Sequence, residues 1–162
     1  METETWIERL VIDQLTTHDR RYKHDYAGVE KTTDDLVAAY TQFDIITTEG
    51  GSEWPPFEQF LSMDLESETE VEATLQTLTE RGLIERVGEH DRLGPPFEPG
   101  GYGTTAIWKP TVEGRAEASE IREAYSSEVH ALEKAYGTDS EEIREEIVSV
   151  ARTYGILPSF FG

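Results

Sequence analysis

Cysteine is absent from this chain of 162 residues, which excludes disulfide bonds, thiolate catalysis and cysteine-ligated zinc. No run approaches the roughly 18 consecutive apolar residues that a membrane-spanning helix requires. The opening residues METETW lack the charged-then-apolar pattern of a secretion signal. We therefore expect a cytoplasmic protein without a membrane segment.

Catalytic and metal-binding motifs are missing as well. The four histidines form no HExxH, and no GxSxG occurs. His18 and His24 lie beside aspartates, but their spacing matches no standard metal motif. The glycine-rich run of residues 94–103 lacks the Lys-Ser/Thr of a P-loop. We expect no enzymatic activity, no cofactor and no metal site.

Basic residues are scarce, with 14 Lys and Arg against 34 Asp and Glu and a formal net charge of −20. This balance, with abundant threonine, is typical of haloarchaeal proteins, which work in molar KCl. At such salt the Debye length is about 3 Å, so surface charges are largely screened from one another. A halophilic archaeal source is the favoured interpretation, and an acidic interaction protein or a nucleic-acid mimic is the alternative.

The central stretch, residues 65–87, has the pattern of a capped helix that leads into a strand. Ser67 and Glu70 have the spacing of a capping box, and Gly82 is expected to end the helix in a left-handed conformation. The helix carries one apolar stripe: Val71, Leu75 and Leu78. The strand continues with three half-buried residues: Leu83, Ile84 and Val87.

The segments before this stretch alternate helices and connectors. Residues 4–17 predict an amphipathic helix whose apolar face holds Trp6, Ile7, Leu10, Val11 and Leu15. Residues 18–31 form a locally basic connector, suited either to phosphate contacts or to pairing with nearby acids. Residues 32–46 predict a helix with a Thr32–Asp35 capping box, and residues 54–64 predict a short helix.

The segments after it predict a hairpin and two helices. Its strands are residues 83–89 and 104–110, joined by a loop over residues 90–103. Thr111 caps a long helix that ends before Gly137; Thr138 and Asp139 cap a last one that ends before Gly155. The long helix has a seam at nearly coiled-coil spacing: Ile121, Tyr125, Val129, Leu132 and Tyr136. The apolar tail after Gly155 is expected to dock on the protein.

The order of these elements resembles winged helix-turn-helix regulators of the MarR and PadR kinds over residues 33–118. Two segments carry the resemblance: the helix end Glu-Arg-Gly-Leu-Ile at residues 80–84, and Pro-Thr-Val-Glu-Gly-Arg at residues 110–115. It implies a mainly α fold with a small β-hairpin wing and extra N- and C-terminal helices. The expected parts are the N-terminal helix and basic connector (1–31), the winged helix-turn-helix domain (32–113) and C-terminal dimerisation helices (114–162).

The resemblance also implies a homodimeric transcriptional regulator that binds double-stranded DNA. Residues 67–81 would form the recognition helix and residues 83–110 the wing, with half-sites about one helical turn apart. The candidate DNA contacts are Ser67, Thr69, Gln76, Arg86, Arg92, Tyr102 and Lys109, flanked by Arg20, Arg21 and Lys23.

The front of the expected recognition helix departs from the usual pattern. Three of its seven front positions are glutamate, and its first arginine is Arg81. This keeps a second function open: a winged-helix module that binds a basic protein or mimics DNA. A small-molecule effector of unknown identity is also open. Its pocket would be lined by aromatic residues that at helical spacing more often belong to the core: Trp6, Tyr40, Trp54 or Tyr125.

Overall fold

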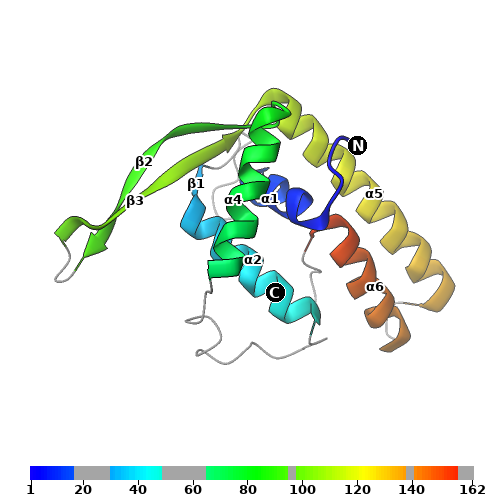
Figure 1. Ribbon diagram of the computed structural model, residues 1–162. Helices are drawn as coiled ribbons and strands as arrows, with labels where there is room; N and C mark the ends of the chain where they lie inside the picture. Colours follow the sequence, from blue (N-terminus) through cyan, green and yellow to red (C-terminus); the bar gives the residue numbers. More distant parts are fainter. Residues whose placement is uncertain (17–29, 49–64, 95–97, 138–140, 157–162) are drawn as a thin grey trace, which may run out of the picture.

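The computed structural model describes residues 1–16, 30–48, 65–94, 98–137 and 141–156 (Figure 1). Within these ranges the protein is mainly helical, with one small antiparallel sheet. The helices are α1 (Trp6–Thr16), α2 (Thr33–Thr48), α4 (Leu65–Glu80), α5 (Val112–Tyr136) and α6 (Glu141–Tyr154). The strands are β1 (Lys31–Thr32), β2 (Ile84–Gly94) and β3 (Glu98–Pro110). None of the described helices is both long and apolar enough to span a bilayer.

Several predicted features lie outside the described residues. They are the basic connector with His18, Arg20, Arg21, Lys23 and His24, the short helix of residues 54–64 with Trp54, the caps at Thr138 and Asp139, and the tail after Ile156.

The sheet has the order β1-β3-β2, and its β2–β3 hairpin extends well away from the helices (Figure 1). Strand pairing continues to Gly94 opposite Glu98, so the predicted loop over residues 90–103 is wrong for most of its length. Before Ile107, β3 pairs only with β2 among the described residues, and a proline such as Pro99 is tolerated at a free strand edge. The two-residue strand β1, opposite Trp108 and Ile107, was not predicted.

The hairpin contains irregularities that change which side chains face the core. The register shifts between Arg86 and Gly88 and again between Asp91 and Leu93. A shift of one residue moves the following side chains to the other face of the strand. Leu83 and Ile84 are buried as predicted, but Val87 is 40% exposed, so its predicted half-buried position is wrong.

The two predicted capping boxes have different outcomes. The box at the start of α2 is confirmed: the Asp35 amide donates to Thr32 Oγ1 and the Thr32 amide donates to Asp35 Oδ2, both at 3.1 Å. The box at Ser67 is wrong, because α4 begins two residues earlier, at Leu65. Glu70 instead accepts a hydrogen bond from the Tyr40 hydroxyl of α2.

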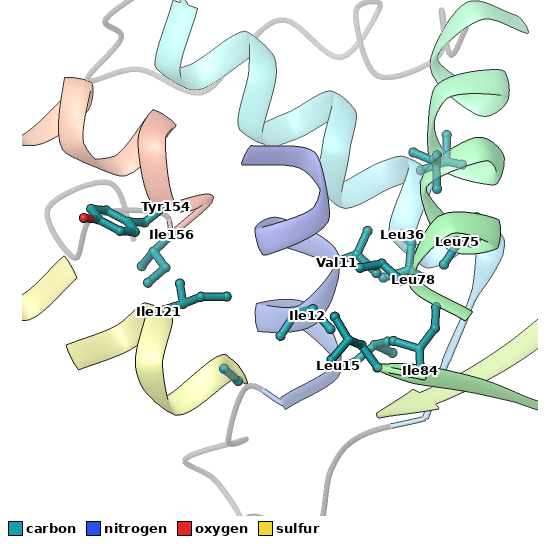
Figure 2. Packing of buried hydrophobic residues seen from close by; sticks show 14 residues of the cluster. Val11, Ile12, Leu15, Leu36, Leu75, Leu78, Ile84, Ile121, Tyr154 and Ile156 are labelled. Atoms are coloured by element: carbon teal, nitrogen blue, oxygen red, sulfur yellow. The ribbon is translucent and has the colours of Figure 1, made fainter. Parts of the chain in front are cut away.

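Helix α1 lies at the centre of the hydrophobic core. Figure 2 shows Val11 facing Leu36 and Leu78 on one side of α1, with Ile121, Tyr154 and Ile156 on the other. The helix contacts α2, α4, α5 and α6. Ile12 is completely buried although it lies off the predicted apolar face. A helix covered on several sides has no single polar face, which explains the difference.

The two segments that carry the family resemblance meet at one junction. Thr111 caps α5 as predicted: its hydroxyl accepts from the Gly114 amide at 3.1 Å and donates to the Gly82 carbonyl at 2.6 Å. The Thr111 amide donates to the Leu83 carbonyl at 3.1 Å. Gly82 has the predicted left-handed backbone, with φ of 75°. The end of α4 and the start of α5 are therefore tied directly to each other.

The C-terminal helices α5 and α6 pack against each other and run in opposite directions (Figure 1). Gly137 and Gly155 have positive φ angles of 79° and 63°, as their predicted roles as helix ends require. The predicted seam of α5 is buried at Ile121 but 46% exposed at Tyr136. The seam is therefore covered within one chain only along part of its length.

Candidate nucleic-acid interface

A groove of about 400 Å³ lies between α4 and the hairpin. Four polar residues of α4 form one wall: Glu72, Gln76, Thr79 and Glu80. The other side is formed by Thr104, Thr105, Ala106 and Trp108 of β3 and by Arg92 of β2. The groove therefore joins part of the predicted recognition helix to part of the predicted wing.

The candidate contacts on α4 are divided between the groove and the start of the helix. Gln76 is exposed in the groove, and its amide makes a long hydrogen bond of 3.4 Å to Glu80 Oε1. Ser67 is half-buried and Thr69 is exposed, and both lie near the start of α4, outside the groove lining. Gln76 is thus the predicted base-reading residue that the structure brings closest to the hairpin.

Arg92 is the cation of this groove, and a carboxylate of α2 holds it. Its Nε and Nη2 atoms donate to the two oxygens of Asp34, each at 2.8 Å. The hydrogen bonds that Arg92 donates to Asp34 raise the pKa of Arg92 above its ordinary value, and the negative charges of Asp34, Glu68 and Glu72 add to the effect. Arg92 therefore lies between α2 and the acidic face of α4.

The other two described cations of the predicted interface are also paired. Arg86 pairs with Glu89 of the same strand. Lys109 Nζ lies 3.2 Å from Glu85 Oε1, directly across the hairpin. All four side chains are at least 41% exposed, and ion pairs in such positions contribute little to stability. The positive charge of the described wing is therefore largely neutralised within the protein.

The remaining candidate contacts have no described side-chain position. Tyr102 lies in β3, but the structure does not describe its side chain. Arg20, Arg21 and Lys23 lie outside the described residues.

Arg81, the first arginine of the expected recognition helix, is used inside the protein. Its guanidinium pairs with Glu8 of α1, a carboxylate that is only 5% exposed. It also donates to the Glu2 carbonyl at 3.2 Å. Arg81 therefore compensates a buried charge, and an unpaired buried carboxylate would be costly.

A set of contacts that the sequence did not predict attaches the hairpin to the start of α2. The Trp108 indole donates to Thr33 Oγ1 at 2.8 Å. The Asp34 amide donates to Thr105 Oγ1 at 3.3 Å, next to the Asp34–Arg92 ion pair. We call Thr33, Asp34, Arg92, Thr105 and Trp108 the hairpin clamp. Asp34 had a visible signal, since acids favour the first turn of a helix, but that signal predicts a cap and not a partner.

Two residues of the predicted effector pocket, Trp6 and Tyr40, contact each other. Trp6 stacks on Tyr40 with ring centroids 5.4 Å apart and on Phe43 at 5.3 Å, and the Arg152 guanidinium lies 4.9 Å from the Trp6 ring. Tyr125 packs against the core, and burial raises the pKa of its hydroxyl. These three aromatic residues therefore contribute to packing, and the effector pocket stays a prediction. In the part of the chain that the structure describes, no three His, Asp or Glu side chains are grouped as a metal site requires.

Comparisons with known proteins give one partial similarity. No family model matches the chain, and no solved structure matches it. An error-prone DNA polymerase of Pseudomonas savastanoi pv. phaseolicola (strain 1448A / Race 6) is 32% identical over 98 residues. The matched part is 57% of this chain but 10% of the polymerase, so the chain spans about a tenth of that relative. The chain is therefore similar to a short part of a DNA polymerase, and this similarity assigns it to no family.

Proposed function

We propose that this protein is a winged helix-turn-helix transcriptional regulator that binds double-stranded DNA. Helix α4 is the recognition helix, and the β2–β3 hairpin is the wing. The observation that carries the proposal is the shared groove, in which exposed polar residues of α4 face the hairpin. A helix and a ribbon on two sides of one groove can contact neighbouring parts of a single duplex.

The arrangement of the elements supports the winged fold. A short strand precedes α2, and α4 leads through the Gly82 turn into the hairpin. The sheet order β1-β3-β2 attaches the hairpin to the start of α2. The wing is therefore held to the same helices that position α4.

The assembly and the working conditions are part of the proposal. The exposed Tyr136 end of α5 is available to a second copy, which would give a homodimer reading two half-sites. Because the described wing cations are paired, few counterions are released on binding, and DNA affinity should fall only shallowly with salt. Such an interface suits the molar KCl of a haloarchaeal cytoplasm.

The proposal is tested by selecting bound duplexes from a random pool in molar KCl. The wild-type protein should enrich an inverted repeat. Gln76→Ala should lose discrimination at one base pair of each half-site, worth about 1–3 kcal/mol, because an amide can read adenine with two hydrogen bonds. Quantitative sequencing of the bound fraction measures the loss.

Gln42→Ala on α2 is the matched control, because Gln42 lies outside the groove lining. It should leave the enriched motif unchanged. A wild-type pool without any enriched sequence would contradict the proposed function.

A second candidate function is binding of a basic protein, and the acidic face of α4 favours it. Glu72 and Glu80 are exposed in the groove. Changing both to glutamine should weaken binding of a lysine- and arginine-rich peptide if that peptide is the natural type of ligand. For a DNA-binding protein the same change should tighten duplex binding by about two- to fivefold at low salt, because two repulsive charges are removed. Fluorescence anisotropy with both probes separates the two functions by the sign of the change.

A further inference from the structure

The Asp34–Arg92 ion pair has the geometry by which arginine recognises phosphate. Two guanidinium nitrogens donate in parallel to two oxygens of one acidic group, each at 2.8 Å. Arginine binds carboxylates and phosphates in this same two-pronged manner. The Asp34 carboxylate therefore occupies the position that a phosphate would take at Arg92.

The pair is accessible to a ligand. The Arg92 side chain is 35% exposed and that of Asp34 is 42% exposed. Arg92 also lines the groove beside α4, where the proposed function places DNA. A phosphate approaching the groove can therefore reach the guanidinium.

Both partners have alternatives when the pair opens. Asp34 lies in the first turn of α2, where the helix dipole stabilises a carboxylate. The hairpin would stay attached through the Trp108–Thr33 hydrogen bond and the pairing of β1 with β3. Since exposed ion pairs contribute little net stability, exchanging Asp34 for phosphate requires little energy.

We propose that Asp34 is an internal competitor for DNA: it holds Arg92 in the free protein, and a DNA phosphate displaces it on binding. The contact is therefore autoinhibitory and weakens binding to any duplex. This inference rests on the proposed DNA-binding function. A purely structural role of the hairpin clamp predicts the opposite effect on DNA affinity. An ion pair that only positioned the wing would strengthen DNA binding, so removing Asp34 would weaken it.

The test compares Asp34→Asn with Asp91→Asn in full-length protein. Asp91 is the exposed sequence neighbour of Arg92 on β2, so both variants remove one negative charge from the same region of the protein, but only the Asp34 carboxylate accepts the two hydrogen bonds of Arg92. Affinity for a random-sequence duplex is measured by fluorescence anisotropy over a series of KCl concentrations. Asp34→Asn should bind about tenfold more tightly at low salt, with a slope of log K against log[KCl] steeper by about 1. In the wild type the displaced Asp34 carboxylate takes up a cation, which offsets the counterion released by the phosphate that binds Arg92, and Asp34→Asn removes this offset. Asp91→Asn should change affinity less than twofold and leave the slope unchanged.

Two further measurements show that Asp34 acts through Arg92. Adding Arg92→Gln to Asp34→Asn should return the affinity and the slope to the wild-type values or below them. In the unmodified protein, the NMR signal of the Arg92 Nε–H group should shift when the duplex is added, since its hydrogen-bond acceptor changes. This second readout does not depend on the folding of any variant.

The outcomes separate the two claims. If neither the wild type nor Asp34→Asn binds any duplex, the proposed function is wrong and this inference is wrong with it. If the wild type binds but Asp34→Asn binds no more tightly than Asp91→Asn, the proposed function stands and the competition by Asp34 is excluded. An Arg92 Nε–H signal that does not move on binding also excludes it.

Discussion

Gly114→Ala should lower the free energy of unfolding by about 3 kcal/mol, the upper range for overpacking a close contact. A Cβ atom at this position would lie 2.0 Å from the Leu83 carbonyl oxygen, which is backbone and cannot rotate away. Helix α5 would have to move, and the bonds from Thr111 to Gly82 and Leu83 would lengthen. For a chain of this length the thermal midpoint should fall by roughly 6–12 °C in a calorimetric scan.

Gly88→Ala makes the same chemical change without the clash. The nearest atom to its added Cβ would be Ile107 Cδ1 at 3.9 Å, an ordinary van der Waals distance. Its stability should stay within about 1 kcal/mol of wild type. Equal thermal midpoints for the Gly114 and Gly88 variants would show that α5 does not approach Leu83 as closely as the structure has it.

The second large effect is expected at Gly155, which ends α6 against the central helix. A Cβ atom there would lie 2.5 Å from both the Trp6 carbonyl oxygen and the Leu10 amide nitrogen of α1. The residue also has φ of 63°, which costs a non-glycine residue about 1–2 kcal/mol. Gly155→Ala should therefore lose about 3–4 kcal/mol of stability in urea unfolding followed by circular dichroism.

Gly82→Ala separates the two causes. Gly82 has a similar φ of 75°, but a Cβ there would meet no atom within 4 Å. This variant should lose only the conformational part, about 1–2 kcal/mol. If both variants lost the same free energy of unfolding, the close contact of Gly155 with α1 would contribute nothing to the destabilisation.

Local signals in the sequence predicted helix ends well where the capping partners are neighbours in the chain. Thr32 with Asp35, and Thr111 with Gly114, cap their helices as expected. The same pattern at Ser67 failed, because α4 begins two residues earlier and Glu70 accepts a hydrogen bond from the Tyr40 hydroxyl on another helix. A capping pattern shows only which hydrogen bonds a carboxylate can form with its sequence neighbours. A partner on another helix can bind the same carboxylate instead.

The charge pattern was harder to interpret for the same reason. Arg92 is 58 positions from Asp34 in the sequence, and Arg81 is 73 positions from Glu8. An arginine next to a predicted recognition helix looks available for DNA until its distant partner is known. The residues of the candidate interface were thus predicted by type, but the pairing that neutralises them was not.

The glycines of the recognised segments show a further limit. The run at residues 110–115 predicted the start of a helix and its threonine cap. It gave no indication that Gly114 lies against the Leu83 carbonyl, because that contact joins the two segments in space. The assignment of the protein to the winged-helix regulators remains a prediction, as does the homodimer.

The central position of α1 has a consequence for biosynthesis. This helix is synthesised before the segments that contain Ile121, Tyr154 and Ile156, which cover its buried side chains. Contacts between such distant segments form late, because the intervening chain must first be closed into a loop. A nascent chain that has not yet reached residue 156 therefore exposes part of the apolar surface of α1, and such surface favours aggregation.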